Sequence, residues 1–143
     1  MKVNQLSVFV ENKSGRLAAI LQSLASNGID ISALSLADTS DFGVLRLIVS
    51  DTSKAKDVLT KSGVIVKITE VLAVGMDDTP GGAYGIVDLM ASAGIDVEYM
   101  YACTSSVPGK ALMVFKPSKL DEAEAVLSKN HFGAVKPEEI YRI

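Results

Sequence analysis

Two short loops carry the residue types that could bind an anion or a small zwitterion. The first runs ENKSGRL from Glu11 to Leu17, and the second runs DDTPGGA from Asp77 to Ala83. Each sets polar residues before a glycine and then an apolar run of helical spacing. The first-turn N–H groups of a helix lack intrahelical partners and lie at the positive end of its dipole, so they can hold a carboxylate. A glycine there lets a ligand approach the backbone.

Residue types for catalysis or metal binding are scarce. One cysteine, Cys103, and one histidine, His131, cannot by themselves form an internal disulfide or a structural zinc site. No nucleophile is paired with a base, and His131 follows a predicted helix end without a partner that we can name. We therefore expect no enzymatic activity, no metal and no cofactor.

Composition bounds the partners. A net charge of -3 and a pI near 5.1, with Lys and Arg scattered along the chain, argue against nucleic acid as a partner. The first residues lack the apolar stretch of a signal peptide, and no segment approaches the length of a membrane span. We expect a cytoplasmic protein with no membrane partner. The mean hydropathy of +0.30, with 48% hydrophobic residues, suggests that apolar surface is also covered in an interface, as in a homodimer.

The chain contains an internal repeat. Three glycine pairs, Gly15 and Gly81, Gly28 and Gly94, and Gly43 and Gly109, are each 66 residues apart. The same offset aligns GIDI from Gly28 with GIDV from Gly94. Agreement at this density indicates duplication. We predict two domains, residues 1–69 and 70–143, joined without a flexible linker.

The spacing of apolar residues predicts the same elements in both copies. In the first copy they are a strand at 6–10, a helix that contains 17–24, strands at 29–37 and 42–50 around a turn at 38–41, a helix at 53–62 and a strand from 64. In the second copy they are a helix that contains 83–90, strands at 95–103 and 109–116, and a helix at 120–130. Gly28 and Gly94 suit the left-handed position that closes a helix, and Thr79-Pro80 predicts an N-cap followed by proline at the first helical position.

This order predicts the fold class: α+β, with two tandem ferredoxin-like βαββαβ units, each a four-stranded antiparallel sheet with two helices on one face. The third strand of each copy is apolar on both faces. One layer of helices cannot cover both, so we expect repeats or chains to pack together.

Other functions of this topology fit poorly. An RNA-binding version needs aromatic residues on the central strands and a basic surface, and a metal-carrying version needs Cys-x-x-Cys after the first strand. Neither pattern is present. A phosphatase version needs an arginine in the loop; Arg16 lies there, but its repeat partner is Gly82 and no nucleophile accompanies it.

The loop motif, with Gly28-Ile29-Asp30-Ile31 after the helix, resembles the signature of the ACT domain, an amino-acid-binding regulatory module. The resemblance covers essentially the whole chain, twice. It is strongest to small stand-alone proteins of two tandem ACT domains, and the first repeat is also similar to the regulatory subunit of acetolactate synthase. It implies a non-enzymatic sensor, expected to be a homodimer, that binds a free amino acid at interdomain sites and modulates a metabolic enzyme or other partner. The alternative is a ligand-free regulatory or interaction subunit of an amino-acid biosynthetic enzyme.

The ligand's carboxylate is expected at the helix starts, and its ammonium at Asn12 and Asp30 near the edge of a neighbouring domain. The predicted ligand-binding residues are Asn12, Ser14, Gly15, Arg16, Leu17, Asp30, Ile31, Asp78, Pro80, Gly81, Gly82, Ala83, Asp96 and Val97.

Structural explanations stay open for each. Gly15 and Gly81 could only shape turns, Asn12 and Asp78 could cap helices, Asp30 and Asp96 could be solvated strand residues, and Leu17 and Ala83 could belong to the core. For Tyr99 and Tyr101 we favour an interface over a ligand pocket.

The two loops differ in charge. The first has Lys13 and Arg16, whereas the second has Asp77 and Asp78 and no cation. An anionic loop repels a carboxylate, so we expect the first loop to make the tighter site.

Overall fold

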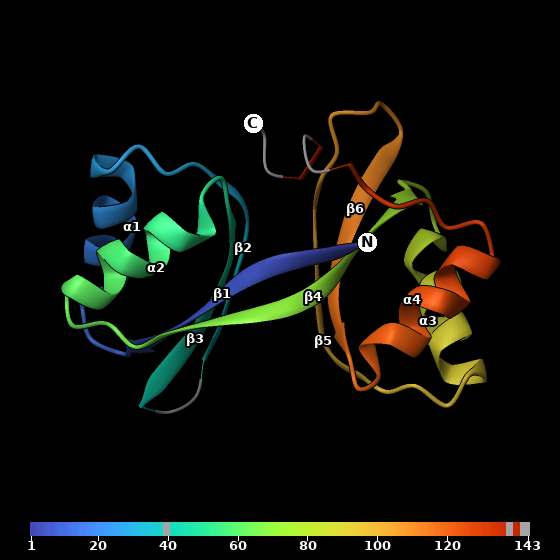
Figure 1. The fold of residues 1–143 in the computed structure, drawn as a ribbon, viewed down its shortest axis with the longest axis horizontal. Helices are drawn as coiled ribbons and strands as arrows, with labels where there is room; N and C mark the ends of the chain where they lie inside the picture. Colours follow the sequence, from blue (N-terminus) through green and yellow to red (C-terminus); the bar gives the residue numbers. More distant parts are fainter. Residues whose placement is uncertain (39–40, 137–138, 141–143) are drawn as a thin grey trace. The chain divides into compact units, whose positions relative to one another are not determined.

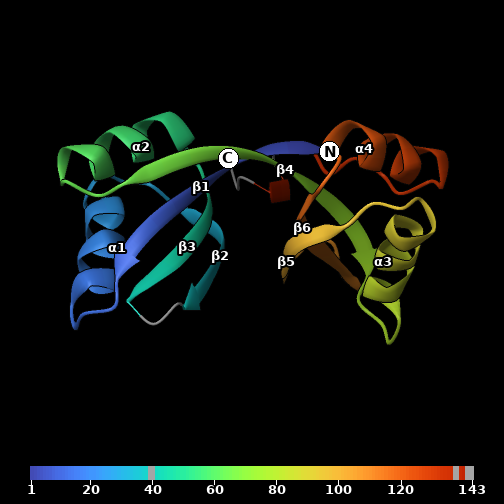
Figure 2. The same ribbon diagram turned by 90° about the horizontal axis from the view of Figure 1, so that it is seen from below.

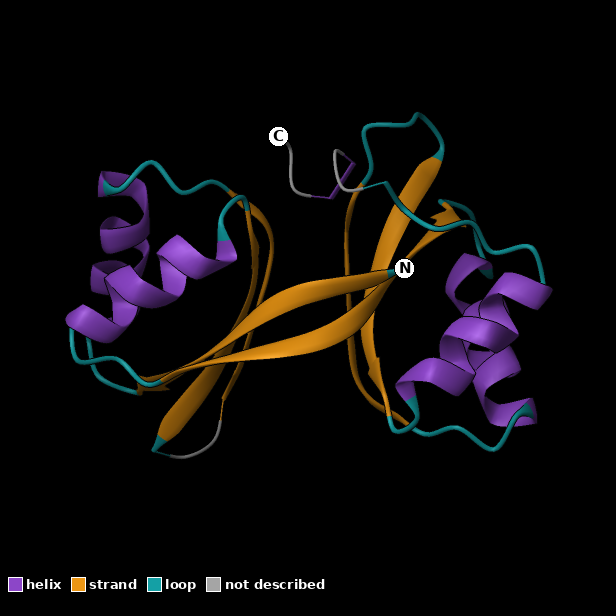
Figure 3. Cartoon of the chain, viewed as in Figure 1, coloured by secondary structure: helices purple, strands orange, loops and turns teal. Residues whose placement is uncertain are grey.

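The computed structural model describes residues 1–38, 41–136 and 139–140 of the chain (Figure 1). The elements are β1 (Lys2–Glu11), α1 (Arg16–Ser26), β2 (Ile31–Asp38), β3 (Phe42–Val49), α2 (Thr52–Lys61), β4 (Val66–Asp77), α3 (Gly82–Ser92), β5 (Val97–Thr104), β6 (Lys110–Pro117) and α4 (Leu120–Lys129). They follow the order βαββαβαββα, in which one strand, β4, is the last strand of the first repeat and the first strand of the second. This α+β architecture confirms the predicted fold class. Figure 3 shows the helices and strands by colour.

The chain forms two compact units. The first unit holds Asn4–Thr69, and the second holds Glu70–Ile140 together with Met1–Val3. Within each unit both helices lie on one face of the strands (Figure 2). In the first unit β3 pairs antiparallel with both β1 and β2, and in the second β6 pairs antiparallel with both β4 and β5.

The core of the first unit comes from the alternation of β1. Leu6, Val8 and Val10 face the helices and are buried against Leu24 of α1 and Leu59 of α2. Their register partners on β3 are Leu47, Leu45 and Gly43. The period-two pattern therefore predicted the buried face of this strand correctly.

The second unit has an equivalent core, which is formed by residues of the second repeat. Leu72 and Val74 of β4, Ile86 of α3, Phe115 of β6 and Leu127 of α4 are all buried. Two further segments of the chain pair with β4 in this unit. The Ala73 N–H donates to the Met1 carbonyl at 2.8 Å, so the beginning of the chain pairs with β4. After α4, Ala134 makes an isolated antiparallel bridge to Val74.

Both predicted glycine helix ends are confirmed. Gly28 and Gly94 each have a φ of 67°, in the left-handed region. The Gly28 N–H donates to Ala25 O at 3.0 Å and the Ile29 N–H to Leu24 O at 3.1 Å, which is the Schellman pattern. Because Ile29 takes part in this helix end, β2 begins at Ile31 and not at the predicted Ile29.

The predicted start of α3 is wrong. Thr79 is not the N-cap and Pro80 is not the first helical residue, because the N-cap is Gly81. The Gly82 N–H donates to Thr79 O at 3.0 Å across a turn that has Pro80 second and Gly81, with a φ of 92°, third. This is a type II turn, in which proline and glycine are favoured at those two positions.

The remaining element boundaries lie within a few residues of those predicted. The predicted turn at 38–41 includes residues 39 and 40, which lie outside the described residues. In the structure β4 is one continuous strand from Val66 to Asp77.

Candidate functional site

The two predicted loops share one backbone geometry. In the first, the Arg16 N–H donates to Lys13 O at 3.2 Å, and Gly15 has a φ of 84° and is the N-cap of α1. This matches the turn at Thr79–Gly82 in the second loop. Asn12 and Asp78 each lie three residues before the N-cap glycine, so the interpretation that they cap the helices is wrong.

The left-handed glycines leave the first-turn amides open. The first helical hydrogen bonds run from Ala19 N–H to Gly15 O at 3.0 Å and from Gly85 N–H to Gly81 O at 3.4 Å. Among the described residues the N–H groups of Leu17 and Ala18 have no acceptor. A glycine N-cap has no side chain to accept from them. Two adjacent free donors at a helix start suit the two oxygens of a carboxylate.

The equivalent donors in the second loop are also open. Within the described chain the N–H groups of Ala83 and Tyr84 have no acceptor. The loops differ at the first helical residue. A Cβ on Gly82 would lie 2.1 Å from the Asp77 carbonyl oxygen, so no side chain fits there, whereas Arg16 occupies the equivalent position in the first loop. Only the first loop can therefore present a cation from this position.

Ion pairs modify the charge of each loop. Glu11 Oε2 lies 3.5 Å from Lys13 Nζ and 3.6 Å from Arg16 Nε. One carboxylate thus faces two cations, which leaves a formal charge of about +1 on exposed groups whose attraction water weakens. In the second loop Lys110 pairs with Asp77, and Asp78 adds another negative charge. The charges of the first loop are therefore more favourable to an anion than those of the second.

The predicted site residues fall into two groups within each unit. The helix starts hold Asn12, Ser14, Gly15, Arg16 and Leu17 in the first unit and Asp78, Pro80, Gly81, Gly82 and Ala83 in the second; the strand starts hold Asp30, Ile31, Asp96 and Val97. Helix α1 separates the two groups of the first unit. Its 11 residues span roughly 16 Å at 1.5 Å per residue. Asp30 therefore does not join Asn12 in a single site inside one unit.

Local hydrogen bonds explain the backbone at these aspartates. The Asp30 N–H donates to Ser50 Oγ at 3.1 Å, and the Ser50 N–H donates to Asp30 O at 3.0 Å. Asp96 and Ser118 make the same pair of bonds at 3.1 and 2.8 Å. The side chains of both aspartates are exposed. Their backbones are structural, which leaves the carboxylates available to a ligand.

The apolar site residues have mixed roles. Leu17 and Ile31 pack against the core of the first unit, and Ala83 and Val97 pack against that of the second. Their side chains are thus structural, and of Leu17 and Ala83 only the backbone N–H groups are open to a ligand. Tyr99 and Tyr101 lie half-buried on β5, paired with Lys116 and Val114. An interface role for them stays a prediction.

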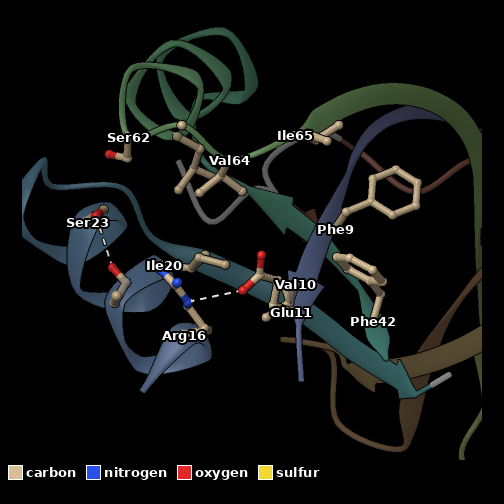
Figure 4. A pocket seen from close by; sticks show the side chains of 13 residues that line it. Phe9, Val10, Glu11, Arg16, Ile20, Ser23, Phe42, Ser62, Val64 and Ile65 are labelled. Atoms are coloured by element: carbon tan, nitrogen blue, oxygen red, sulfur yellow. Dashed lines mark hydrogen bonds and ion pairs between the residues drawn. The ribbon is translucent and has the colours of Figure 1, made fainter. Parts of the chain in front are cut away.

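Sequence reasoning missed a cavity in the first unit between α1 and the end of α2. We call it the α1–α2 cavity. It has a volume of about 250 Å³ and lies beside the first loop (Figure 4). Its lining residues are Phe9, Val10, Glu11, Arg16, Ala19, Ile20, Ser23, Phe42, Leu59, Ser62, Gly63, Val64 and Ile65. Figure 4 shows Arg16 and Glu11 facing one another at its polar side. Its walls come from segments about 40 residues apart, which periodicity alone does not bring together.

No group of three or more His, Cys, Asp or Glu side chains that could hold a metal occurs in residues 1–38, 41–136 and 139–140. Among the same residues, none of the helices is long and apolar enough to cross a membrane.

Comparisons with known proteins identify the family of the chain. A family model described as an ACT domain pair matches residues 1–143. No curated protein matches. The crystal structure of protein BT0572 from Bacteroides thetaiotaomicron is 35% identical, with a TM-score of 0.91, and the match covers 100% of this chain and 98% of that one.

Two more distant crystal structures share the fold. The ligand-free regulatory subunit of aspartate kinase from Thermus thermophilus is 17% identical, with a TM-score of 0.64, over 92% of this chain and 93% of that one. The corresponding subunit from Thermus flavus is 19% identical, with a TM-score of 0.64, over 92% and 94%.

Proposed function

This chain belongs to the ACT domain family, and from that premise we propose that it binds a free amino acid and regulates a metabolic enzyme or other partner. One observation carries the proposal. Each repeat begins its first helix with a left-handed glycine and two backbone N–H groups that no described residue accepts from. A free amino acid presents a carboxylate that these donors fit. The proposal gives the chain a regulatory role and no catalytic one.

The first loop is the proposed high-affinity site. The carboxylate accepts from the N–H groups of Leu17 and Ala18 and lies near the cations of Lys13 and Arg16. The side chain of Asn12 supplies an acceptor for the ammonium. The weaker electrostatics of the second loop, with Asp77 and Asp78, make it a low-affinity or structural copy.

A second copy of the chain completes the proposed site. Because α1 separates Asp30 from the loop of its own unit, a carboxylate that reaches the ammonium must come from another ACT unit, and we assign it to Asp30 of a second copy. Ligand then bridges two chains. Binding that favours the bridged arrangement shifts the population toward it, and this shift is the signal to the regulated partner.

An exposed apolar strand supports the alternative of a ligand-free interaction subunit. Leu34 and Leu36 on β2 are 54% and 47% exposed, although their register partners Leu47 and Leu45 are buried. Apolar side chains on a strand at the margin of a sheet favour a protein partner. The same surface suits a homodimer, so it does not exclude ligand binding.

A thermal-shift panel of the twenty amino acids tests the proposal. A ligand at about 100 times its Kd stabilises the folded state by roughly 2.7 kcal/mol. For a chain of this size this corresponds to a Tm increase of several degrees. We expect one amino acid, or a chemically related group, to give such a shift. A panel without any shift would overturn the sensor function and leave the interaction subunit.

A further inference from the structure

The position that Val64 takes at the wall of the α1–α2 cavity is occupied in the second unit by a phenylalanine. Val64 and Phe132 are equivalent, because each follows a left-handed residue and donates its N–H to a core leucine, Leu59 at 3.1 Å and Leu127 at 3.0 Å. Phe132 Cζ lies 3.7 Å from the position that a Cβ on Gly85 would take. The Phe132 ring of the second unit thus takes the position that Val64 has in the first unit.

A second pair of residues differs in the same direction. Ser23 lines the cavity and is equivalent to Leu89, which packs against the core of the second unit. The Ser23 hydroxyl donates to the Ala19 carbonyl at 3.0 Å, within its own helix. At both positions the first repeat therefore has the smaller side chain: Val64 in place of Phe132, and the polar Ser23 in place of Leu89. Both of these residues lie at the wall of one cavity, where they leave more space than Leu89 and Phe132 would, although Ala19 in the same wall is larger than its equivalent Gly85.

The polar side of the cavity is complementary to a zwitterion. Arg16 Nε and Glu11 Oε2 lie 3.6 Å apart there (Figure 4). Glu11 Oε2 is buried and accepts no hydrogen bond from the described residues, although two cations lie near it. A buried acceptor without a donor is unfavourable, and an ammonium group would satisfy it. The Arg16 side chain is 59% exposed, so its guanidinium can pair with a ligand carboxylate as well as with Glu11.

The remaining wall is apolar and sets the size of the ligand. Ile20, Leu59 and Val64 line it. Cavities of about 150 Å³ with such walls hold benzene, whereas drug-sized ligands need about 300 to 1,000 Å³. The cavity volume of about 250 Å³ lies between these limits. It fits a branched or aromatic side chain together with a small polar head group.

We propose that the α1–α2 cavity binds a free amino acid with a branched or aromatic side chain. The ligand side chain takes the place that the Phe132 ring takes in the second unit, its carboxylate pairs with Arg16, and its ammonium pairs with Glu11. This inference rests on the proposed function for the class of ligand. It differs in place, because the site lies inside one unit and uses side chains in place of the open amides of Leu17 and Ala18.

Val64→Phe is the direct test, since it gives the first repeat the residue of the second. Titration calorimetry with L-valine, L-leucine, L-isoleucine and L-phenylalanine should show at least a tenfold loss of affinity, with Tm unchanged or raised. Val87→Phe is the matched control, because Val87 is 38% exposed on α3 and lines no part of the cavity. It should bind as the unmodified chain does. Unchanged affinity in Val64→Phe would overturn the inference.

Two further measurements keep the test decisive if Val64→Phe does not fold. Ser23→Leu, the other residue exchange between repeats, should weaken binding in the same way. In the unmodified chain, titration with the same amino acids should shift the methyl resonances of Ile20, Leu59 and Val64. Shifts confined to other methyl groups would overturn the inference.

The outcomes separate this inference from the proposed function. If none of the twenty amino acids binds, both fail. If binding survives Val64→Phe and is lost in Ala18→Pro, which removes an open amide outside the cavity, the proposed function stands and the inference fails. If binding is lost in Val64→Phe and survives Ala18→Pro, the ligand occupies the cavity, amino-acid binding stands, and the loop site on the amides of Leu17 and Ala18 fails.

Discussion

The ring of Phe132 lies over Gly85 of helix α3, with Cζ 3.7 Å from the position of a Cβ on that residue. This is an ordinary contact distance, so a methyl group fits. Glycine inside a helix costs about 0.5 to 1 kcal/mol relative to alanine. We expect Gly85→Ala to raise the free energy of unfolding by about that amount. Urea denaturation measures it.

Gly82 in the same helix provides the opposite control. Its Cβ would lie 2.1 Å from the Asp77 carbonyl oxygen, a backbone atom that cannot move freely. Overpacking of this kind typically costs about 1 to 3 kcal/mol, so Gly82→Ala should destabilise the chain. Equal effects of the two substitutions would show that helix propensity alone decides both.

The second stability prediction concerns His131. It has a φ of 65° at the end of α4, where Gly63 has a φ of 80° at the end of α2. The left-handed conformation costs a residue other than glycine about 1 to 2 kcal/mol. His131→Gly should therefore stabilise the chain by roughly 1 kcal/mol, and Gly63→Ala should destabilise it by a similar amount. A destabilised His131→Gly would mean that the imidazole makes compensating contacts.

The sequence predicted the parts of this fold that local chemistry decides. Gly28 and Gly94 were assigned to helix ends, because glycine followed by an apolar residue completes the hydrogen bonds of the last turn. Pro80 was misplaced, because its fixed φ suits both the first turn of a helix and the second position of a type II turn. Gly81 decides between them through its positive φ.

Features that depend on distant segments were not predictable. The pairing of Met1 with Ala73 joins the beginning of the chain to the second repeat. The α1–α2 cavity arises because Ser23 and Val64 face the same space from different elements. Each of these residues is unremarkable in its own segment. Only the comparison with Leu89 and Phe132 at the equivalent positions shows that Ser23 and Val64 are the smaller side chains.

The backbone of Asp30 has a structural role, whereas its side chain is assigned to the ligand. Its backbone exchanges two hydrogen bonds with Ser50, while its side chain is exposed. Ser50→Ala should cost about 1 kcal/mol of stability, because the Asp30 N–H loses its acceptor. Asp30→Asn should change stability by less than about 0.5 kcal/mol, as for other exposed positions. Chemical denaturation of both variants distinguishes the two effects.

Amino-acid binding tests the proposed contact between the Asp30 side chain and the ammonium of the ligand. If Asp30 of a second copy receives the ammonium, Asp30→Asn weakens amino-acid binding while the fold keeps its stability. Ser118→Ala is the control in the second unit, where Ser118 makes the equivalent bonds to Asp96. It should lower stability without changing affinity. Loss of binding in Ser118→Ala but not in Asp30→Asn would contradict the assignment to the first repeat.

Lys2 should titrate above its ordinary value. Its Nζ donates to Asp121 at 2.6 Å, and this hydrogen bond is the main cause that raises the pKa of Lys2 above 10.5, with Glu70 and Glu124 adding to it. A raised pKa in the folded state means that the interaction contributes fully below pH 10.5 and is lost as pH rises through the folded value. NMR titration of the Lys2 side chain should show the raised pKa. Asp121→Asn should lower it toward 10.5.

The open amide of Ala18 gives the sharpest test of the loop site. Proline at residue 18 removes one N–H that has no acceptor among the described residues, and the first turn of a helix tolerates proline. Ala18→Pro should therefore keep the fold and, if the carboxylate lies on this amide, weaken amino-acid binding at least tenfold, or about 1.4 kcal/mol. Titration calorimetry measures the loss.

Tyr84 is the equivalent residue in α3, 70% exposed, and its N–H is also open. Tyr84→Pro makes the same chemical change beside Asp77 and Asp78, where the negative charge disfavours a carboxylate. It should leave the affinity almost unchanged. Affinity lost in Tyr84→Pro but kept in Ala18→Pro would reverse the assignment, and the second loop would then be the ligand site despite its charge.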